Sequence, residues 1–161
     1  MAYMSINWSV DKHATGLPSN VLGQEYGQHI LNIKLASDTD NGMLIAADDS
    51  KVWPEFDVFD EKAVTTFEGI VEQQMPNGNW LVLVTDPGDA CLVYQKPLTP
   101  YESPRELTDE SAFYNKEGDI VRSYVLSKWD RFEASEKAFS ATPVAGKKIT
   151  GVANKKMTLA S

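Results

Sequence analysis

The sequence has little material for the commonest catalytic and metal-binding chemistries. It contains two histidines, one cysteine, and no apolar run longer than residues 80–84. Two histidines offer little for a histidine-dependent triad or a multi-histidine metal centre. A single cysteine, Cys91, excludes an intrachain disulfide and a cysteine-rich zinc site. Because the apolar runs are far shorter than a membrane span, we expect a soluble protein made in a cytoplasm.

Acidic residues are what the sequence has in excess. Its 161 residues carry 23 Asp and Glu against 15 Lys and Arg, a net charge of −8. This balance argues against a sequence-independent grip on nucleic acid or on an anionic membrane. The charge is uneven, since residues 1–136 hold ten basic and twenty-three acidic side chains, whereas residues 137–161 hold five lysines and no acid. The basic end is either a solvated lysine face or a handle for an acidic partner, including a neighbouring copy.

Turn residues and alternating apolar positions predict a mainly β fold, a small β-barrel or β-sandwich with no long helix. Residues 1–29 are polar with scattered glycines, which predicts an extended N-terminal arm that adds little to the stability of a β-rich domain at 30–161. We expect a hairpin of residues 30–35 and 43–47. A three-stranded meander of residues 66–72, 80–84 and 90–94 is expected to pair near the C-terminal strands. Further strands are expected at 119–126, 131–134, 148–152 and 157–160.

Three other segments have distinctive local signals. Pro54 argues against a central strand, so residues 52–63 are expected to be irregular or an edge element. Ser135 can cap a single helical turn at residues 136–139. Residues 97–107 form a proline-rich loop whose length marks it as a candidate interface.

The remaining chemical candidates are weak. The glycine of residues 38–42 comes one position early for an EF-hand calcium loop, and no closing glutamate follows, so a turn is the better interpretation. The acids Asp48, Asp49, Asp57, Asp60 and Glu61 resemble an acid–base or divalent-ion cluster, but so acidic a chain produces such clusters by chance. Cys91 stands among apolar residues and is expected to be a buried thiol. We therefore expect no cofactor and no metal.

The four tryptophans, Trp8, Trp53, Trp80 and Trp129, fall at unrelated spacings, which does not favour a sugar-binding platform. Trp80 lies in an expected strand and is assigned to the core. Trp129 lies in an expected turn, and we predict that it is exposed. It is either a contact to a partner or a lid on the barrel end.

The C-terminal third resembles the small head proteins, also called capsid decoration or cement proteins, of tailed bacteriophages. The resemblance rests on GDIVRSYVL at 118–126, DRFEAS at 130–135, Ala-Phe at 138–139 and Gly-Lys at 146–147. It covers about 45 residues, 117–160, and weakens through the meander. Where this pattern has a glycine-type tight turn, Trp129 stands before Asp130.

The resemblance implies a structural virion protein on the capsid surface, with the phage major capsid protein and further copies of itself as partners and with no enzymatic activity. The alternatives are a carbohydrate or host-surface binding module, or another phage structural component of the tail, the head–tail joint or a head-fibre base. Contacts to the capsid or between copies are assigned to the arm and the 97–107 loop, where a few large side chains usually dominate an interface. The expected contact residues are Trp8, Leu17, Tyr26, Tyr101 and Trp129.

Overall fold

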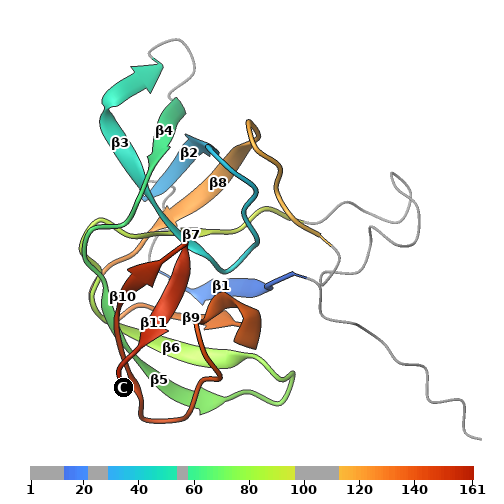
Figure 1. The fold of residues 1–161 in the computed structure, drawn as a ribbon, viewed down its shortest axis with the longest axis vertical. Coiled ribbons are helices and arrows are strands. Elements are labelled where there is room, and N and C mark those ends of the chain that lie inside the picture. The colour runs from blue at the N-terminus through green and yellow to red at the C-terminus, as the bar shows by residue number, and fades with distance from the viewer. Residues whose placement is uncertain (1–12, 22–28, 54–57, 97–112) are drawn as a thin grey trace, which may run out of the picture.

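The computed structural model describes residues 13–21, 29–53, 58–96 and 113–161, which are built mainly from β-strands (Figure 1). The elements are β1 (Gly16–Asn20), β2 (Ile30–Lys34), β3 (Leu44–Trp53), β4 (Val58–Lys62), β5 (Glu68–Gln74), β6 (Trp80–Asp86), β7 (Cys91–Val93), β8 (Ile120–Val125), β9 (Arg131–Ala134), η3 (Glu136–Ala138), β10 (Lys148–Ala153) and β11 (Lys156–Leu159). The prediction of a mainly β fold with a barrel is confirmed. No helix in the described part of the chain is long and apolar enough to cross a membrane.

The strands form two sheets. One is a closed barrel in the order β2-β4-β3-β7-β8, and the other is a six-stranded sheet in the order β1-β9-β6-β5-β10-β11. Figure 1 shows the barrel strands β2, β3, β4 and β8 in the upper part and the strands β5, β6, β9, β10 and β11 in the lower part. The chain passes repeatedly between the two, so each sheet is assembled from segments distant in sequence.

The two sheets share a core because two barrel strands are buried on both faces. Leu44 pairs with Leu92, and Ile45 pairs with Cys91, across β3 and β7. Leu44 and Leu92 pack into the larger cluster with residues of the six-stranded sheet such as Phe132. Ile45 and Cys91 belong to a second cluster from the barrel strands. Successive side chains point to opposite faces of a strand, which explains why these segments read as continuous apolar runs.

The predicted hairpin of residues 30–35 and 43–47 is wrong. β2 pairs in parallel with β4 and antiparallel with β8, whereas β3 pairs with β4 and β7. The expectation of an irregular or edge element at residues 52–63 is also wrong for β4, which lies between β2 and β3. Pro54 itself lies outside the described residues.

The predicted three-stranded meander is half right. β5 and β6 form the expected hairpin, with Gly78 in its turn at φ 89°. β7 instead leaves this sheet and pairs with β3 and β8 in the barrel. Gly88, at φ 51°, lies in the turn between β6 and β7, where a Cβ atom would stand 2.0 Å from the carbonyl oxygen of Thr66. A side chain at this position would therefore clash with the backbone of Thr66. The expected proximity to the C-terminal strands is confirmed through the β5–β10, β6–β9 and β7–β8 pairs.

Residues 13–21 are part of the sheet, which corrects their assignment to an arm; residues 1–12 lie outside the described residues. β1 pairs antiparallel with β9, and Ala14 and Val21 on either side of it are buried in the larger core. The absence of a side chain at Gly16 permits this packing, since a Cβ atom there would lie 2.5 Å from the Cα atom of Gly42.

Ser135 has a different role from the predicted helix cap. It occupies the N-cap position of η3, but its side chain makes no capping hydrogen bond. Its hydroxyl oxygen instead accepts a hydrogen bond from the backbone N–H of Thr15, at 2.9 Å. The carbonyl of Thr15 in turn accepts from the N–H of Ser135, at 2.8 Å. Ser135 thus fixes the start of β1 against the end of β9.

Candidate interaction surface

The structure describes two of the five predicted contact residues. Trp8, Tyr26 and Tyr101 lie outside the described residues. Leu17 is half-buried in β1 opposite Glu133 of β9. Trp129 precedes β9 and is 61% exposed, which confirms its predicted exposure. Leu17 thus lies within the β1–β9 pair, whereas Trp129 lies in the turn that precedes β9.

The turn before β9 holds Trp129 in an unusual conformation. Its φ of 76° lies in the left-handed region, which large side chains rarely occupy. Its N–H donates to the carbonyl of Val84 in β6, at 2.9 Å. The carboxylate of Asp130, a 7% exposed residue, accepts from the N–H of Ser127, at 2.8 Å. The N–H of Asp130 donates back to the carbonyl of Ser127, at 3.1 Å. These bonds hold Trp129 where a glycine is expected.

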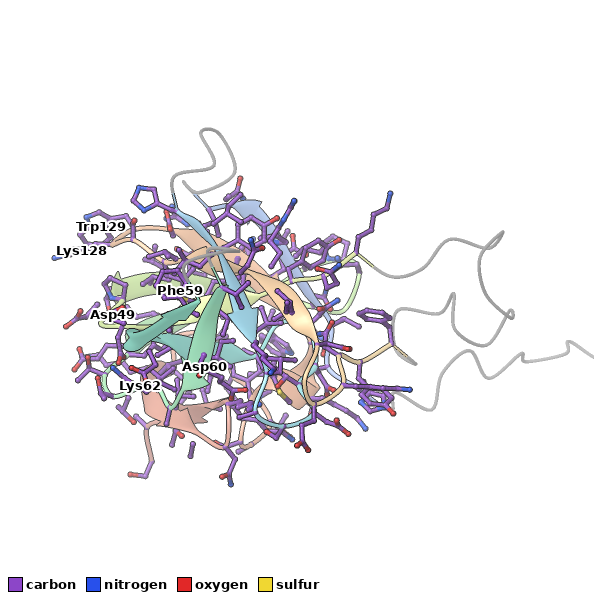
Figure 2. The ribbon with its side chains drawn as sticks, turned by 90° about the horizontal axis from the view of Figure 1, so that it is seen from above. Asp49, Phe59, Asp60, Lys62, Lys128 and Trp129 are labelled. Carbon is purple, nitrogen blue, oxygen red and sulfur yellow. The ribbon has the colours of Figure 1, made fainter. Side chains whose placement is uncertain are left out.

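A cation accompanies the exposed indole ring. The Nζ atom of Lys128 lies 5.0 Å from the ring centroid of Trp129, within cation–π range. Figure 2 shows Lys128 and Trp129 next to each other at the margin of the molecule. The pair presents an aromatic surface and a positive charge together to the solvent.

A second cluster surrounds residues 38–42, the loop before β3. The carboxylate of Asp40 contacts the ring Nδ1 of His13 at 2.8 Å and accepts from the N–H of Ala14 at 2.8 Å. The imidazole of His13 stacks on the ring of Tyr114, with centroids 4.6 Å apart. His13 and Tyr114, which lie at the beginnings of two described ranges, are therefore neighbours in the fold.

The same loop also fixes the chain just before residue 97. The side-chain amide of Asn41 donates to the carbonyl of Gln95 at 2.8 Å, and its oxygen accepts from the N–H of Gln95 at 3.0 Å. Asn115 donates to the carbonyl of Thr39 at 3.0 Å. Hydrogen bonds thus connect the loop of residues 38–42 to Gln95 and Asn115. The carboxylate of Asp40 is bonded to His13 and Ala14. Across the described ranges, no group of three or more His, Cys, Asp or Glu is placed to hold a metal ion.

The fold brings Asp48 and Asp60 of the suspected cluster together across β3 and β4, whereas Glu61 pairs with a lysine. Glu61 forms an ion pair with Lys155 at 2.8 Å, with 8% and 16% of the respective side chains exposed. The Nζ atom of Lys155 also donates to the carbonyl of Ser37 at 3.1 Å and to the hydroxyl of Thr39. The pair ties β4 and the loop after β2 to the β10–β11 turn. Asp48 lies opposite Asp60 in the β3–β4 register. Asp49 is exposed, and Asp57 lies outside the described residues.

Cys91 is the buried thiol that the sequence predicts. It is 3% exposed, and burial, together with the negative charges of Asp89 and Asp49, raises its pKa to about 12. Burial would also raise the pKa of Asp89, but hydrogen bonds from Thr65 and Thr66 outweigh it and lower that pKa. The lowered pKa keeps Asp89 negatively charged at neutral pH, and this charge disfavours ionisation of the nearby thiol. Cys91 is therefore not an activated nucleophile.

A polar hollow that the sequence does not predict lies beside β7 and β8. Its volume is about 200 Å³, and it is lined by Tyr94, Gln95, Lys96, Arg122 and Tyr124. Arg122 is 28 positions from Tyr94, and the antiparallel pairing of β7 with β8 brings them together. A local sequence pattern does not predict this cluster, because the lining residues come together only when β7 pairs with β8.

No protein family, curated protein or solved structure matches the chain.

Proposed function

We propose that the protein is a structural virion protein that binds to and stabilises the outside of a bacteriophage head. The resemblance at residues 117–160 supports the proposal. That stretch forms consecutive elements of the fold, β8, β9, η3, β10 and β11. These elements are strands and turns, and the activity that the resemblance implies is protein contact, so the proposal contains no catalytic step.

The observation that carries the proposal is the conformation of Trp129. A non-glycine residue in the left-handed region costs of order 1–3 kcal/mol, and such strain persists where the surrounding structure over-determines it. The turn does so here through the bonds of Ser127, Asp130 and Val84. The strain places a large aromatic side chain in the solvent with 61% of its surface exposed. Tryptophan is among the residue types that are enriched at the positions carrying most of the binding energy of protein interfaces.

The proposed partners are the major capsid protein and sister copies on its lattice. The residues that flank both 1–12 and 97–112, such as His13, Gln95 and Tyr114, gather around the loop of residues 38–42. Contacts made by either segment would therefore start from the same place. Many weak copies on one lattice add through avidity, so each site needs only a modest interface.

The proposal is tested with Trp129→Gly, using heads assembled from the major capsid protein encoded in the same genome. Glycine adopts a positive φ freely, so the turn should keep its shape and the melting temperature should not fall. Co-sedimentation with the heads should weaken at least tenfold. Val144→Ala is the control, because Val144 is another large apolar residue with an exposed side chain, at 54%.

Any of three results would contradict the proposal. Unchanged co-sedimentation of the Trp129→Gly protein would remove this turn from the interface. A genome with no major capsid protein, or saturable binding to glycans rather than to heads, would favour the carbohydrate-binding alternative.

A further inference from the structure

The hollow beside β7 and β8 has a lining unlike the rest of this acidic molecule. Two of its five lining residues, Lys96 and Arg122, are cationic, and none is a carboxylate. The chain as a whole carries 23 acids and a net charge of −8. We call this hollow the Arg122 pocket.

Strand pairing places the lining side chains on one face. Leu92 pairs with Tyr124, and the N–H of Tyr94 donates to the carbonyl of Arg122 at 3.2 Å. Because alternate residues of a strand share a face, Tyr94, Tyr124 and Arg122 project to the same side. The two tyrosine rings lie 6.5 Å apart at 50°, and Tyr124 is 6% exposed. The pocket thus has an aromatic, largely buried wall.

The rim of the pocket is held in place by hydrogen bonds within the protein. Asn41, which is 5% exposed, bonds to both the N–H and the carbonyl of Gln95. The side-chain oxygen of Gln95 accepts from the backbone N–H of Arg122, at 3.5 Å. A site fixed in this way loses little conformational freedom when it binds, which favours affinity.

The two cations of the pocket are uncompensated within the described part of the chain. Arg131 pairs with Glu72 at 2.9 Å, and Lys155 pairs with Glu61 at 2.8 Å. Neither Arg122 nor Lys96 forms an ion pair with any described residue. Within the described ranges, no carboxylate neutralises either charge.

We propose that the Arg122 pocket binds the side-chain carboxylate of a glutamate or aspartate on a partner protein. A guanidinium group matches a carboxylate with two parallel hydrogen bonds, and Lys96 adds a second positive charge. The tyrosine rings can pack against the methylene groups of the bound side chain. The proposal concerns any acidic partner and does not depend on the capsid function.

The size and polarity of the pocket favour a protein side chain over a sugar acid. About 200 Å³ is less than the roughly 300–1,000 Å³ of pockets that enclose drug-sized ligands. Sugar hydroxyls also require acceptors, and the pocket contains no carboxylate. The side-chain oxygen of Gln95 already accepts from Arg122.

The test is a heteronuclear NMR titration of the full chain with a blocked glutamate, N-acetyl-glutamate N-methylamide. We expect saturable shifts of the amide signals of Gln95, Lys96 and Arg122. The corresponding blocked glutamine, which is neutral and nearly isosteric, should cause none. Arg122→Gln should weaken binding at least tenfold, and Lys96→Gln should weaken it severalfold. Arg131→Gln is the matched control, since it removes another exposed arginine, and its affinity should equal that of the unmodified protein.

Three results would overturn the inference. The first is equal shifts with blocked glutamine. The second is unchanged affinity in both Arg122→Gln and Lys96→Gln, each of which can be checked for folding from the dispersion of its own spectrum. The third is tighter saturable binding of N-acetylneuraminic acid than of blocked glutamate, which would assign the pocket to a sugar acid.

Discussion

At the scale of single residues, position in a strand decides whether a reactive group is available. Cys91 is the single cysteine of the chain, yet its partner Ile45 and the barrel core enclose its thiol. Asp89, two residues earlier, keeps its negative charge because Thr65 donates to both carboxylate oxygens, each at 2.9 Å. The charge and the burial act in the same direction on the thiol, and both raise its pKa.

We therefore predict that Cys91 resists alkylation in the folded protein. With a pKa of about 12, only about one thiol in ten thousand is ionised at pH 8, and burial further blocks the reagent. Labelling with iodoacetamide at pH 8 should be at least about a thousandfold slower than in urea-unfolded protein, where the pKa returns to its ordinary value near 8.5. The rate in folded protein should rise as the pH is raised toward 12. Equally fast labelling of folded and unfolded protein would contradict the structure.

Residue-level inference from the sequence succeeded where the local pattern carries the information. The apolar neighbours of Cys91 predicted burial, and the turn signal at Trp129 predicted exposure. It did not foresee that Trp129 itself occupies the left-handed position, nor that Ser135 turns its hydroxyl toward Thr15. Both depend on partners from distant strands. The Arg122 pocket could not be predicted for the same reason.

At the scale of elements, the ion pair between Glu61 and Lys155 joins the barrel to the six-stranded sheet. Lys155 and Asn154 both have positive φ, at 65° and 49°, as a two-residue hairpin turn of the favoured type requires. This turn directs the ammonium group of Lys155 to Glu61 and to the carbonyl of Ser37. Removing one partner from a largely buried pair leaves the other charge without compensation.

Lys155→Met should accordingly lower the free energy of unfolding by about 3 kcal/mol, because Glu61 remains buried with a hydrogen bond from Ala36 and no cation. Lys156→Met is the matched control, since Lys156 is the next residue and forms no ion pair with any described residue. It should change stability by less than about 0.5 kcal/mol. Urea denaturation at pH 7 measures both. Equal stabilities of the two variants would show that the pair does not hold the sheets together.

Most strands were predictable from the sequence, but β1, β4 and the pairing of the strands were not. The segments β5, β6, β8, β9, β10 and β11 fall where alternation and turn residues predict them. The parallel pairing of β2 with β4 and the departure of β7 into the barrel are long-range choices. The continuous apolar runs of β3 and β7 agree with burial on both faces, but such a run does not specify which strands pair with it.

At the scale of the whole molecule, β1 and the residues that flank it join the core that the two sheets share. Ala14, Val21 and Phe132 belong to one core cluster that also contains Leu44 and Leu92 from the barrel. β1 lies at one edge of the six-stranded sheet, against β9. The segment of residues 13–21 therefore contributes to the same core that unites both sheets.

Two truncations should then behave differently. Deletion of residues 1–12 leaves every pairing of β1 in place, and the melting temperature should remain within about 2 °C of that of the full chain. Deletion of residues 1–20 removes β1 and the buried Ala14, and it exposes the edge of β9. Buried apolar surface contributes about 25 cal/mol per Å², so losing the apolar contacts of this segment should lower the free energy of unfolding by several kcal/mol. The melting temperature should fall by roughly 10 °C or more, given about 2–4 °C per kcal/mol for a chain of this size.

Thermal denaturation followed by circular dichroism distinguishes the two cases, and the deletion of residues 1–12 is the control for chain shortening. Equal melting temperatures for both truncations would mean that β1 adds nothing to the core. If the deletion of residues 1–12 leaves the melting temperature unchanged as predicted, the same variant can test whether these residues bind to heads. Any loss of co-sedimentation would then reflect a lost contact, because β1 is still present.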